Sequence, residues 1–138
     1  MTSNVKRLNE YWTDIYFHLH YPHTDKVSHQ VIRILQLVEK KEGIGVNEVA
    51  THLQISHNTA SEHVKRMVEK NLLVKERGLQ DERRVLLRLT ESGKEVLHRN
   101  TSLDEEKLEK VMAELGNKER EVVEQAFKIL SEQAKTCL

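Results

Sequence analysis

Cysteine is almost absent from the sequence, and long apolar runs are missing altogether. Cys137 is the only cysteine, so one chain can form neither a disulfide nor a cysteine-based zinc site. No apolar run approaches the roughly 20 residues that a membrane span needs, and the N-terminus is polar rather than the apolar core of a signal peptide. These absences exclude disulfide-rich and membrane proteins, and we expect a cytoplasmic protein.

Proline, glycine and aromatic residues are also scarce. The 138 residues include one proline and five glycines, and 4% are aromatic, 38% hydrophobic and 32% charged. Such a composition is typical of a mostly helical globular protein and not of a β-sandwich or a disordered chain. The length allows one core, so we expect a single domain over residues 1–138.

Motifs of catalysis and cofactor binding are missing as well. The sequence has no glycine-rich phosphate loop, no HExxH zinc motif and no nucleophile elbow. We therefore expect no enzymatic activity, no cofactor and no metal.

The charges are balanced in total but unevenly distributed. The formal net charge is zero, yet residues 56–88 contain eight basic and five acidic residues, and residues 101–138 contain six basic and nine acidic ones. Phosphate contacts need local positive potential rather than a positive total. The basic middle of the chain is therefore the candidate region for nucleic-acid binding.

Apolar residues recur every three or four positions through most of the chain, and this spacing predicts helices. The predicted helices run approximately over residues 4–20, 27–42, 48–53, 57–71, 91–115 and 118–130. Residues of the types that cap helix N-termini precede most of them: Asp25 or Ser28, Asn47, Ser56, Thr90 and Asn117. The polar stretch 100–102 could kink the fifth helix.

A β-hairpin follows the fourth predicted helix. Residues 73–77 and 85–89 alternate with the period of a strand, and Gly78–Asp81 supplies turn chemistry between them. The two helices before the hairpin are joined by a tight turn, as in a helix-turn-helix. We expect a mainly α fold with a small β-hairpin wing, which is a winged helix-turn-helix.

The helix predicted at about 57–71 carries polar side chains of the kinds that read DNA. Its inner face is apolar, and its outward Asn, Glu, Lys and Arg side chains can bond base edges in a major groove. Residues at its start are better placed for phosphate, because the free N–H groups there favour an anion. The candidate contacts are Ser56, His57, Asn58, Thr59, Ser61, Glu62, Lys65 and Arg66.

The hairpin adds two more candidate contacts. Arg83 and Arg84 lie at its tip, where a guanidinium can enter a narrow minor groove, and Asp81 is placed to orient Arg83. The alternative is a solvated amphipathic helix followed by a charged hairpin, with no nucleic acid involved. The order of elements and the charge distribution favour DNA binding.

The segment Asp81–Gly93, DERRVLLRLTESG, resembles the wing-to-helix signature of the MarR family of multiple-antibiotic-resistance regulators. VATHLQISHNTAS at residues 49–61 resembles that family's helix-turn-helix, and the order of elements matches over nearly the whole chain. The resemblance implies a transcriptional repressor that binds a pseudo-palindromic operator in double-stranded DNA as a homodimer. Residues of about 43–100 would form the DNA-binding lobe, and those of about 4–42 and 101–138 would form the dimerisation helices.

The sequence independently allows this dimer. Trp12, Ile15, Phe127 and Leu130 would stay partly exposed on the first and last helices of a lone chain, and large apolar patches usually find a partner.

Three positions depart from the family pattern. Gln54 and Asn71 stand where the family usually has glycine, and Glu62 occupies a position that is often basic. Glutamine in a left-handed turn carries a steric cost that glycine avoids, so we expect mild strain at Gln54. An acidic Glu62 favours a specific base contact over generic phosphate binding.

The first helix offers two further sites. His18, His20 and His23 cluster near its end, so a metal-responsive regulator is an alternative, although the i, i+2 spacing points the first two to different sides of a helix. Trp12 and Tyr16 could stack on a small effector, although packing is the commoner fate of such residues. Cys137 is expected to pack in the dimer seam rather than to sense oxidants. A winged helix that binds protein instead of DNA is the last alternative.

Overall fold

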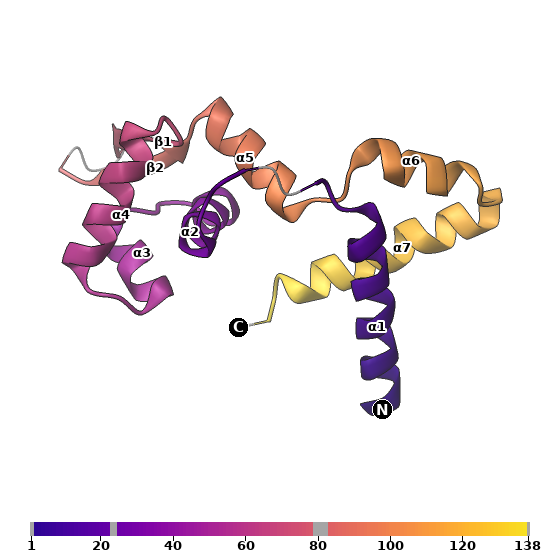
Figure 1. The fold of residues 1–138 in the computed structure, drawn as a ribbon. Helices are drawn as coiled ribbons and strands as arrows, with labels where there is room; N and C mark the ends of the chain where they lie inside the picture. The colour runs from indigo at the N-terminus through magenta and orange to yellow at the C-terminus, as the bar shows by residue number, and fades with distance from the viewer. Residues whose placement is uncertain (1, 23–24, 79–82, 138) are drawn as a thin grey trace. The chain divides into compact units, whose positions relative to one another are not determined.

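The computed structural model describes residues 2–22, 25–78 and 83–137 of the chain. Contacts divide it into two compact units: the central unit, His20–Ser102, and the terminal unit, which combines the residues up to Leu19 with those from Leu103 onward. Figure 1 labels the helices and strands. They are α1 (Thr2–Leu19), α2 (His29–Lys40), α3 (Val46–Leu53), α4 (His57–Glu69), β1 (Leu73–Arg77), β2 (Val85–Leu89), α5 (Glu91–Thr101), α6 (Glu105–Ala113) and α7 (Asn117–Ala134). No described helix is long and apolar enough to cross a bilayer.

The hairpin has the bounds that the sequence predicted. β1 and β2 pair antiparallel from Leu73 opposite Leu89 to Arg77 opposite Val85. The mainly α architecture with a small hairpin is therefore confirmed.

Side-chain caps fix the starts of three helices at the predicted residues. The Oγ of Ser28 accepts a hydrogen bond from the third residue of α2, and that of Ser56 does the same in α4. Thr90 Oγ1 accepts the Gly93 N–H at 2.9 Å and donates to the Asn71 carbonyl at 2.7 Å, so it joins the start of α5 to the end of the α4 segment. Asn71 itself is left-handed, with φ of 61°.

The core of the central unit is built from the inner faces of α2 to α5 and from one face of the hairpin. Its largest fully buried side chains are Ile34, Leu35, Val49, Val64, Met67, Leu73 and Leu97. All are aliphatic or sulfur-containing, so this core is held by apolar burial rather than by buried charge.

The starts of α3 and α7 differ from the prediction by one or two residues. The N-caps are Gly45 and Gly116, not Asn47 and Asn117. Glu48, in the third helical position of α3, accepts the Gly45 N–H at 2.7 Å. A glutamate at the third position thus satisfies the backbone where the cap itself has no side chain.

Glycine at the start of α3 allows a close approach to the hairpin. The Ile44 carbonyl accepts the Leu87 N–H of β2 at 2.8 Å. A Cβ on Gly45 would lie 2.8 Å from the Val85 carbonyl oxygen, so a larger residue would push the two backbones apart.

The predicted long fifth helix is two helices. α5 ends at Thr101, and Asp104 starts α6 by accepting the Glu106 and Lys107 N–H groups at 3.0 and 3.4 Å. The Asp104 N–H also donates to the Leu19 carbonyl at 2.7 Å. The cap and this second bond replace helical hydrogen bonds, so the polar stretch ends the helix instead of kinking it.

The terminal unit has no buried core of its own among its described side chains. α6 and α7 contain no buried residue, and every described residue of α1 is exposed or half-buried. Its apolar residues line a groove of about 260 Å³ instead: Leu8, Tyr11, Trp12, Ile15, Val123, Ala126, Phe127 and Leu130. Helices that bury so little cannot form a stable folded unit alone.

A charged clamp ties the segment before α2 to the end of α5. Arg99 donates to both carboxylate oxygens of Asp25, each at 3.0 Å, and Asn100 Nδ2 donates to Asp25 at 3.1 Å. Asp25 therefore does not cap α2. Hydrogen bonding and charge from Arg99, against a smaller effect of burial, lower the pKa of Asp25 below its ordinary value of 3.8.

We expect Asp25→Asn to reduce the free energy of unfolding by about 1 kcal/mol at pH 7, since Asp25 is mostly shielded but Arg99 is partly exposed. A carboxylate whose pKa is lowered on folding stabilises the fold above its unfolded pKa, and this stabilisation is lost as the pH falls through the folded pKa. The difference between wild type and variant should therefore be constant above about pH 5 and shrink below pH 3.8. Urea unfolding across this range measures it. Asp14→Asn on exposed α1 is the control, and a difference independent of pH would refute the clamp.

Candidate nucleic-acid interface

The outward face of α4 is a polar strip opposite the buried side of the helix. Ala60, Val64 and Met67 point into the core. Asn58 and Lys65 are exposed on the other side, together with Ser61 and Glu62. Because exposed side chains with both donors and acceptors line one helix, the arrangement can bond base edges in a groove.

The turn before α4 is tight, and Gln54 adopts left-handed geometry in it with φ of 57°. Its N–H donates to the Ala50 and Thr51 carbonyls, and the Ile55 N–H donates to Ala50 at 3.0 Å. The expected strain is therefore present, since this geometry costs a non-glycine residue about 1–2 kcal/mol. The turn sets α4 against α3.

The polar groups at the start of α4 are held by bonds within the helix-turn-helix. Ser56 Oγ donates to Thr59 Oγ1 at 2.8 Å and accepts the Thr59 N–H at 3.1 Å. His57 Nδ1 lies 2.8 Å from Asn47 Oδ1 on α3. All three of Ser56, His57 and Thr59 are at least partly exposed, so a helix N-terminus with its positive dipole end faces solvent here.

Arg84 lies where the loop of the hairpin joins β2, which we call the hairpin root, and not at the free tip that the sequence suggested; it anchors this root beside the start of α3. It donates to the Gly43 carbonyl and to Glu48 Oε1, each at 2.9 Å. Glu48 therefore caps α3 and holds Arg84 at the same time. Sequence reasoning missed these contacts of Arg84, because its partners lie 41 and 36 residues away.

The hairpin root and the start of α4 meet at a small cavity. His57, Arg83, Arg84 and Val85 line this space of about 310 Å³ beside the start of α3. Arg83 is exposed. Asp81, expected to orient Arg83, lies outside the described residues, so that expectation stays a prediction.

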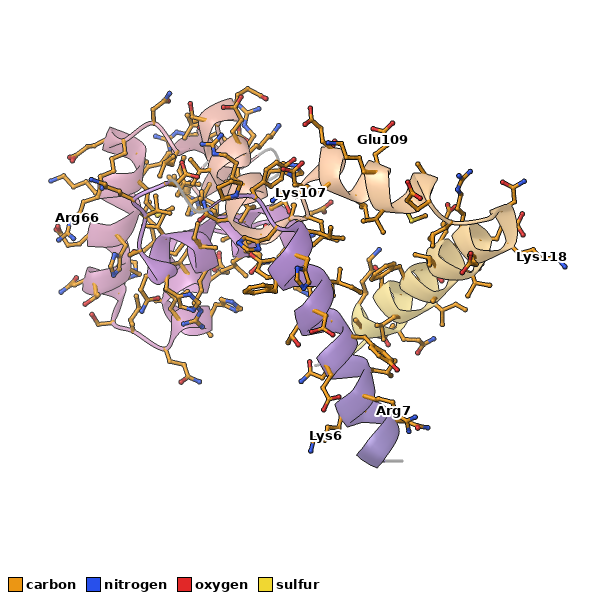
Figure 2. All side chains as sticks on the ribbon, turned by 45° about the vertical axis from the view of Figure 1, so that its right-hand side comes forward. Lys6, Arg7, Arg66, Lys107, Glu109 and Lys118 are labelled. Atoms are coloured by element: carbon orange, nitrogen blue, oxygen red, sulfur yellow. The ribbon has the colours of Figure 1, made fainter. Side chains whose placement is uncertain are left out.

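Arg66 lies on the flank of α4 rather than at the centre of its outward face. It follows Lys65 by one position, which turns it about 100° around the helix. Figure 2 shows the labelled Arg66 projecting away from α4. Its guanidinium is exposed and basic, which suits a phosphate better than a base edge.

The other predicted sites lie on or near α1. The Trp12 and Tyr16 rings are 6.1 Å apart, and Trp12 also lines the apolar groove, so their role as an effector pocket stays a prediction. The His18 ring packs edge-on against Phe17, and His20 lies one residue beyond α1. His23 is outside the described residues, and the described part of the chain holds no group of three side chains suited to a metal.

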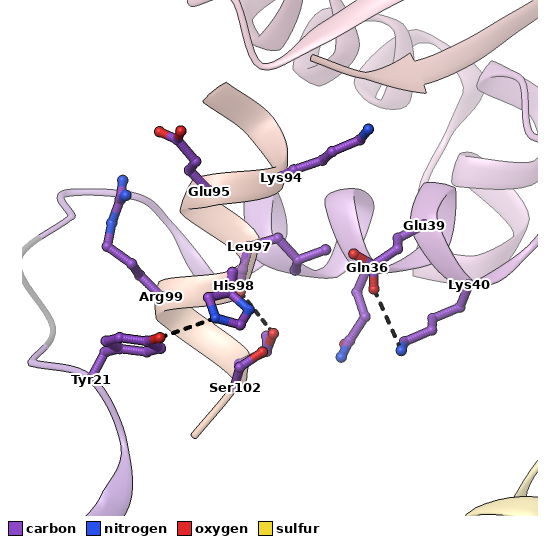
Figure 3. Close-up of a pocket in the computed structure, with 11 residues that line it drawn as sticks. Tyr21, Gln36, Glu39, Lys40, Lys94, Glu95, Leu97, His98, Arg99 and Ser102 are labelled. Atoms are coloured by element: carbon purple, nitrogen blue, oxygen red, sulfur yellow. Dashed lines mark hydrogen bonds and ion pairs between the residues drawn. The ribbon is translucent and has the colours of Figure 1, made fainter. Parts of the chain in front are cut away.

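A cavity that sequence reasoning missed lies between α2 and α5 (Figure 3). It has a volume of about 570 Å³, and Tyr21, Gln36, Lys40, Lys94 and His98 are among its lining residues. Tyr21 Oη and His98 Nε2, which both belong to its lining, lie 3.1 Å apart. These polar residues are scattered over the sequence without a motif, so no local signal marks the cavity.

The family model described as transcriptional regulator SarA/Rot matches residues 24–100, which is more than half of the chain. The chain belongs to this family. The match covers α2, the helix-turn-helix, the hairpin and most of α5, so the SarA/Rot match includes the polar strip and the hairpin root described above. The predicted MarR-type winged helix is thereby confirmed for this SarA/Rot regulator.

Solved structures of MarR-family regulators share its fold. S. aureus MepR bound to ethidium bromide has a TM-score of 0.59 at 20% identity, covering 96% of this chain and 95% of that one. A point mutant of Lactococcus lactis ZitR has a TM-score of 0.54 at 21% identity over 94% and 96% of the two chains. PcaV from Streptomyces coelicolor, in complex with its natural ligand, has a TM-score of 0.52 at 23% identity over 94% and 90%. Comparison with curated proteins finds no match.

Proposed function

We propose that this SarA/Rot regulator binds double-stranded DNA as a homodimer and represses transcription from a pseudo-palindromic operator. The observation that carries the proposal is the exposed polar strip of α4 beside a hairpin whose root is bonded to α3 through Arg84. When α4 and the wing are fixed relative to each other, they can enter adjacent grooves of a duplex. The proposal assigns no catalytic step to the chain.

The residues at the centre of the strip would read the bases. Asn58 can bond adenine through its amide, Glu62 can accept from the cytosine amino group, and Lys65 can donate to guanine. Ser61 is a further polar contact on the same exposed face.

The residues at the edges of the strip would bind phosphate. Ser56, His57 and Thr59 surround the N-terminus of α4, where N–H groups and the helix dipole favour an anion. Arg66 on the flank adds positive charge. These contacts would fix the position of α4 on DNA without reading sequence.

The wing contributes in two ways. Arg83 is exposed next to the anchored Arg84, and its guanidinium can enter a minor groove. Arg84 acts as a positioning residue through Gly43 and Glu48, and its bonds keep the wing root beside α3. With Asp81 as the residue that orients Arg83, the wing would contact the groove next to the one that α4 occupies.

The homodimer would form through the terminal unit. Its described helices lack a buried core and expose a groove of apolar side chains, among them Leu8, Trp12, Phe127 and Leu130. A second copy of the same face offers matching apolar surface, and isologous pairing of this kind is the commonest way to bury it. Two copies would then place two α4 helices on successive major grooves, roughly 34 Å apart.

A small effector would control DNA binding by changing the spacing of the two α4 helices. MepR has been solved with ethidium bromide and PcaV with its natural ligand, and we propose an effector for this chain as well. An effector changes DNA affinity only through its different affinities for the DNA-competent and DNA-incompetent states.

Fluorescence anisotropy with a labelled duplex from the promoter of its own gene tests DNA binding. We expect affinity to fall about 1,000-fold or more between 50 and 200 mM salt, because bound cations on the DNA are released at each phosphate contact. An interaction module that binds protein need not respond in this way. A flat salt dependence, or no binding to any duplex, would refute the proposal.

In the same assay, two variants distinguish a contact that positions the protein on DNA from a contact that reads a base. We expect Arg83→Ala to weaken binding to all duplexes alike, and Asn58→Ala to lose preference at one base pair at a cost of about 1–3 kcal/mol. Lys128→Ala, which removes an exposed charge from α7, is the control and should bind as wild type does. If Arg83→Ala bound DNA with wild-type affinity, the assignment of Arg83 to DNA contact would be wrong.

A further inference from the structure

The charges on the outward side of α4 cancel. Glu62 and Lys65 belong to the polar strip, and Arg66 and Glu69 follow them on the same exposed side of the helix. The side chains of these four residues form no ion pair or hydrogen bond within the described part of the chain. Because the charges sum to zero, this side of α4 offers a duplex little attraction that is independent of sequence.

Glu62 places a carboxylate at the centre of the strip. It lies one turn after Asn58, and both side chains are exposed. A carboxylate accepts hydrogen bonds and donates none, so in a major groove it needs an amino group, above all that of cytosine. Against other base edges it would lose water without gaining a donor, close to phosphates of the same charge. Glu62 would therefore weaken binding to wrong duplexes more than it strengthens binding to the right one.

Positive charge without an acidic partner lies beside the strip. Lys26, just before α2, and Lys70, just after α4, line one concave surface together with Arg66, and we call these three residues the basic flank. All three are exposed and form no ion pair within the described ranges. Asp25, the acid next to Lys26 in the sequence, is bonded to Arg99 instead. The basic flank can thus attract the phosphates of any duplex, which the neutral strip cannot.

We propose that Glu62 sets the specificity of DNA binding by excluding duplexes without a cytosine amino group opposite it, while Lys26 and Lys70 supply attraction that is independent of sequence. This inference rests on the proposed function and deepens it, because it assigns discrimination and general affinity to different residues. Removing the carboxylate should then reduce discrimination, and removing the two cations should reduce affinity for every duplex.

Glu62→Gln tests the exclusion. Fluorescence anisotropy compares a duplex that wild type selects from a random library with a scrambled duplex of the same composition. We expect the scrambled duplex to bind the variant about tenfold more tightly than it binds wild type, so the ratio of the two affinities falls. Since glutamine pairs with adenine, a second selection should show one base pair per half-site changing from C·G to A·T. An affinity ratio equal to that of wild type would overturn the role of Glu62.

Glu69→Gln is the matched control for the charge. Glu69 is the last residue of α4 and lies about two turns after Glu62 on the same side of the helix. Its loss should strengthen binding to both duplexes alike and preserve their affinity ratio. A ratio that fell as far in Glu69→Gln as in Glu62→Gln would show that the net charge of α4 sets discrimination, and would overturn the assignment to Glu62.

Lys26→Met/Lys70→Met tests the basic flank. We expect both duplexes to bind about tenfold or more weakly, with an unchanged affinity ratio and a log–log salt slope that is less steep by about 2 for each protomer. Lys128→Met on exposed α7 should keep the wild-type slope. A wild-type slope in the double variant would overturn the role of Lys26 and Lys70. If wild type itself binds no duplex, the proposed function fails; if wild type binds and the variants match it, only the present inference fails.

Discussion

Gly93→Ala is expected to destabilise the central unit by about 3 kcal/mol, the upper end of the usual cost of overpacking. Gly93 occupies the first turn of α5, where the helix lies directly on the Leu72 backbone. A Cβ there would overlap the Leu72 carbonyl oxygen and also crowd its carbonyl carbon. Either α5 must move away from β1 or the Leu72 carbonyl must turn.

The Leu72 carbonyl has little freedom to turn. It accepts the Thr90 N–H at 3.1 Å, and the Leu72 N–H donates to Met67 at 2.9 Å. Urea unfolding measures the loss as a lower midpoint. Ser92→Ala, at the exposed neighbouring position, is the control and should lie within about 0.5 kcal/mol of wild type. A Gly93→Ala midpoint equal to that of the control would show that α5 does not dock on Leu72 as described.

Phe127→Asp is expected to convert the protein to a monomer and to lower specific DNA affinity by about 100-fold or more. Phe127 lines the apolar groove with Trp12 and Leu130, and α7 has no buried residue to hold it otherwise. A homodimer would place two new carboxylates in its apolar interface, where an unpaired charge is strongly unfavourable. Without the proposed dimer, each binding event would lack the second half-site contact.

Sedimentation at micromolar concentration measures the oligomeric state of this variant. Gln125→Asp is the matched control, since it puts the same charge on α7 at a position that does not line the groove. It should remain a dimer. A dimeric Phe127→Asp protein would mean that another surface joins the two copies.

Local sequence signals predicted the parts of the fold that local physics decides. Ser56 and Thr90 were recognisable as caps because the capped N–H lies within three residues, and the strands of the hairpin were recognisable by alternation. The break before α6 had a signal of the same kind: Asp104 followed by two glutamates is a good helix start. The sequence prediction treated the polar stretch 100–102 as a possible kink within one helix and so missed this start.

Contacts between distant segments could not be predicted from the sequence. Arg84 lies in a basic run that suggests DNA contact, and only the fold brings it to Gly43 and Glu48. The same holds for the cavity between α2 and α5, whose lining residues only the fold brings together. In the candidate interface, sequence patterns predicted which residue types lie on α4. They did not predict which of these side chains are hydrogen-bonded to neighbouring residues.

The root of the wing is joined to its surroundings by three short bonds: Leu87 N–H to Ile44, and Arg84 to Gly43 and to Glu48. Folding has therefore already supplied the ordering that docking would otherwise require at this point. In the proposed complex with DNA, little conformational entropy would be lost at the wing root, so association should be limited by collision and orientation rather than by rearrangement.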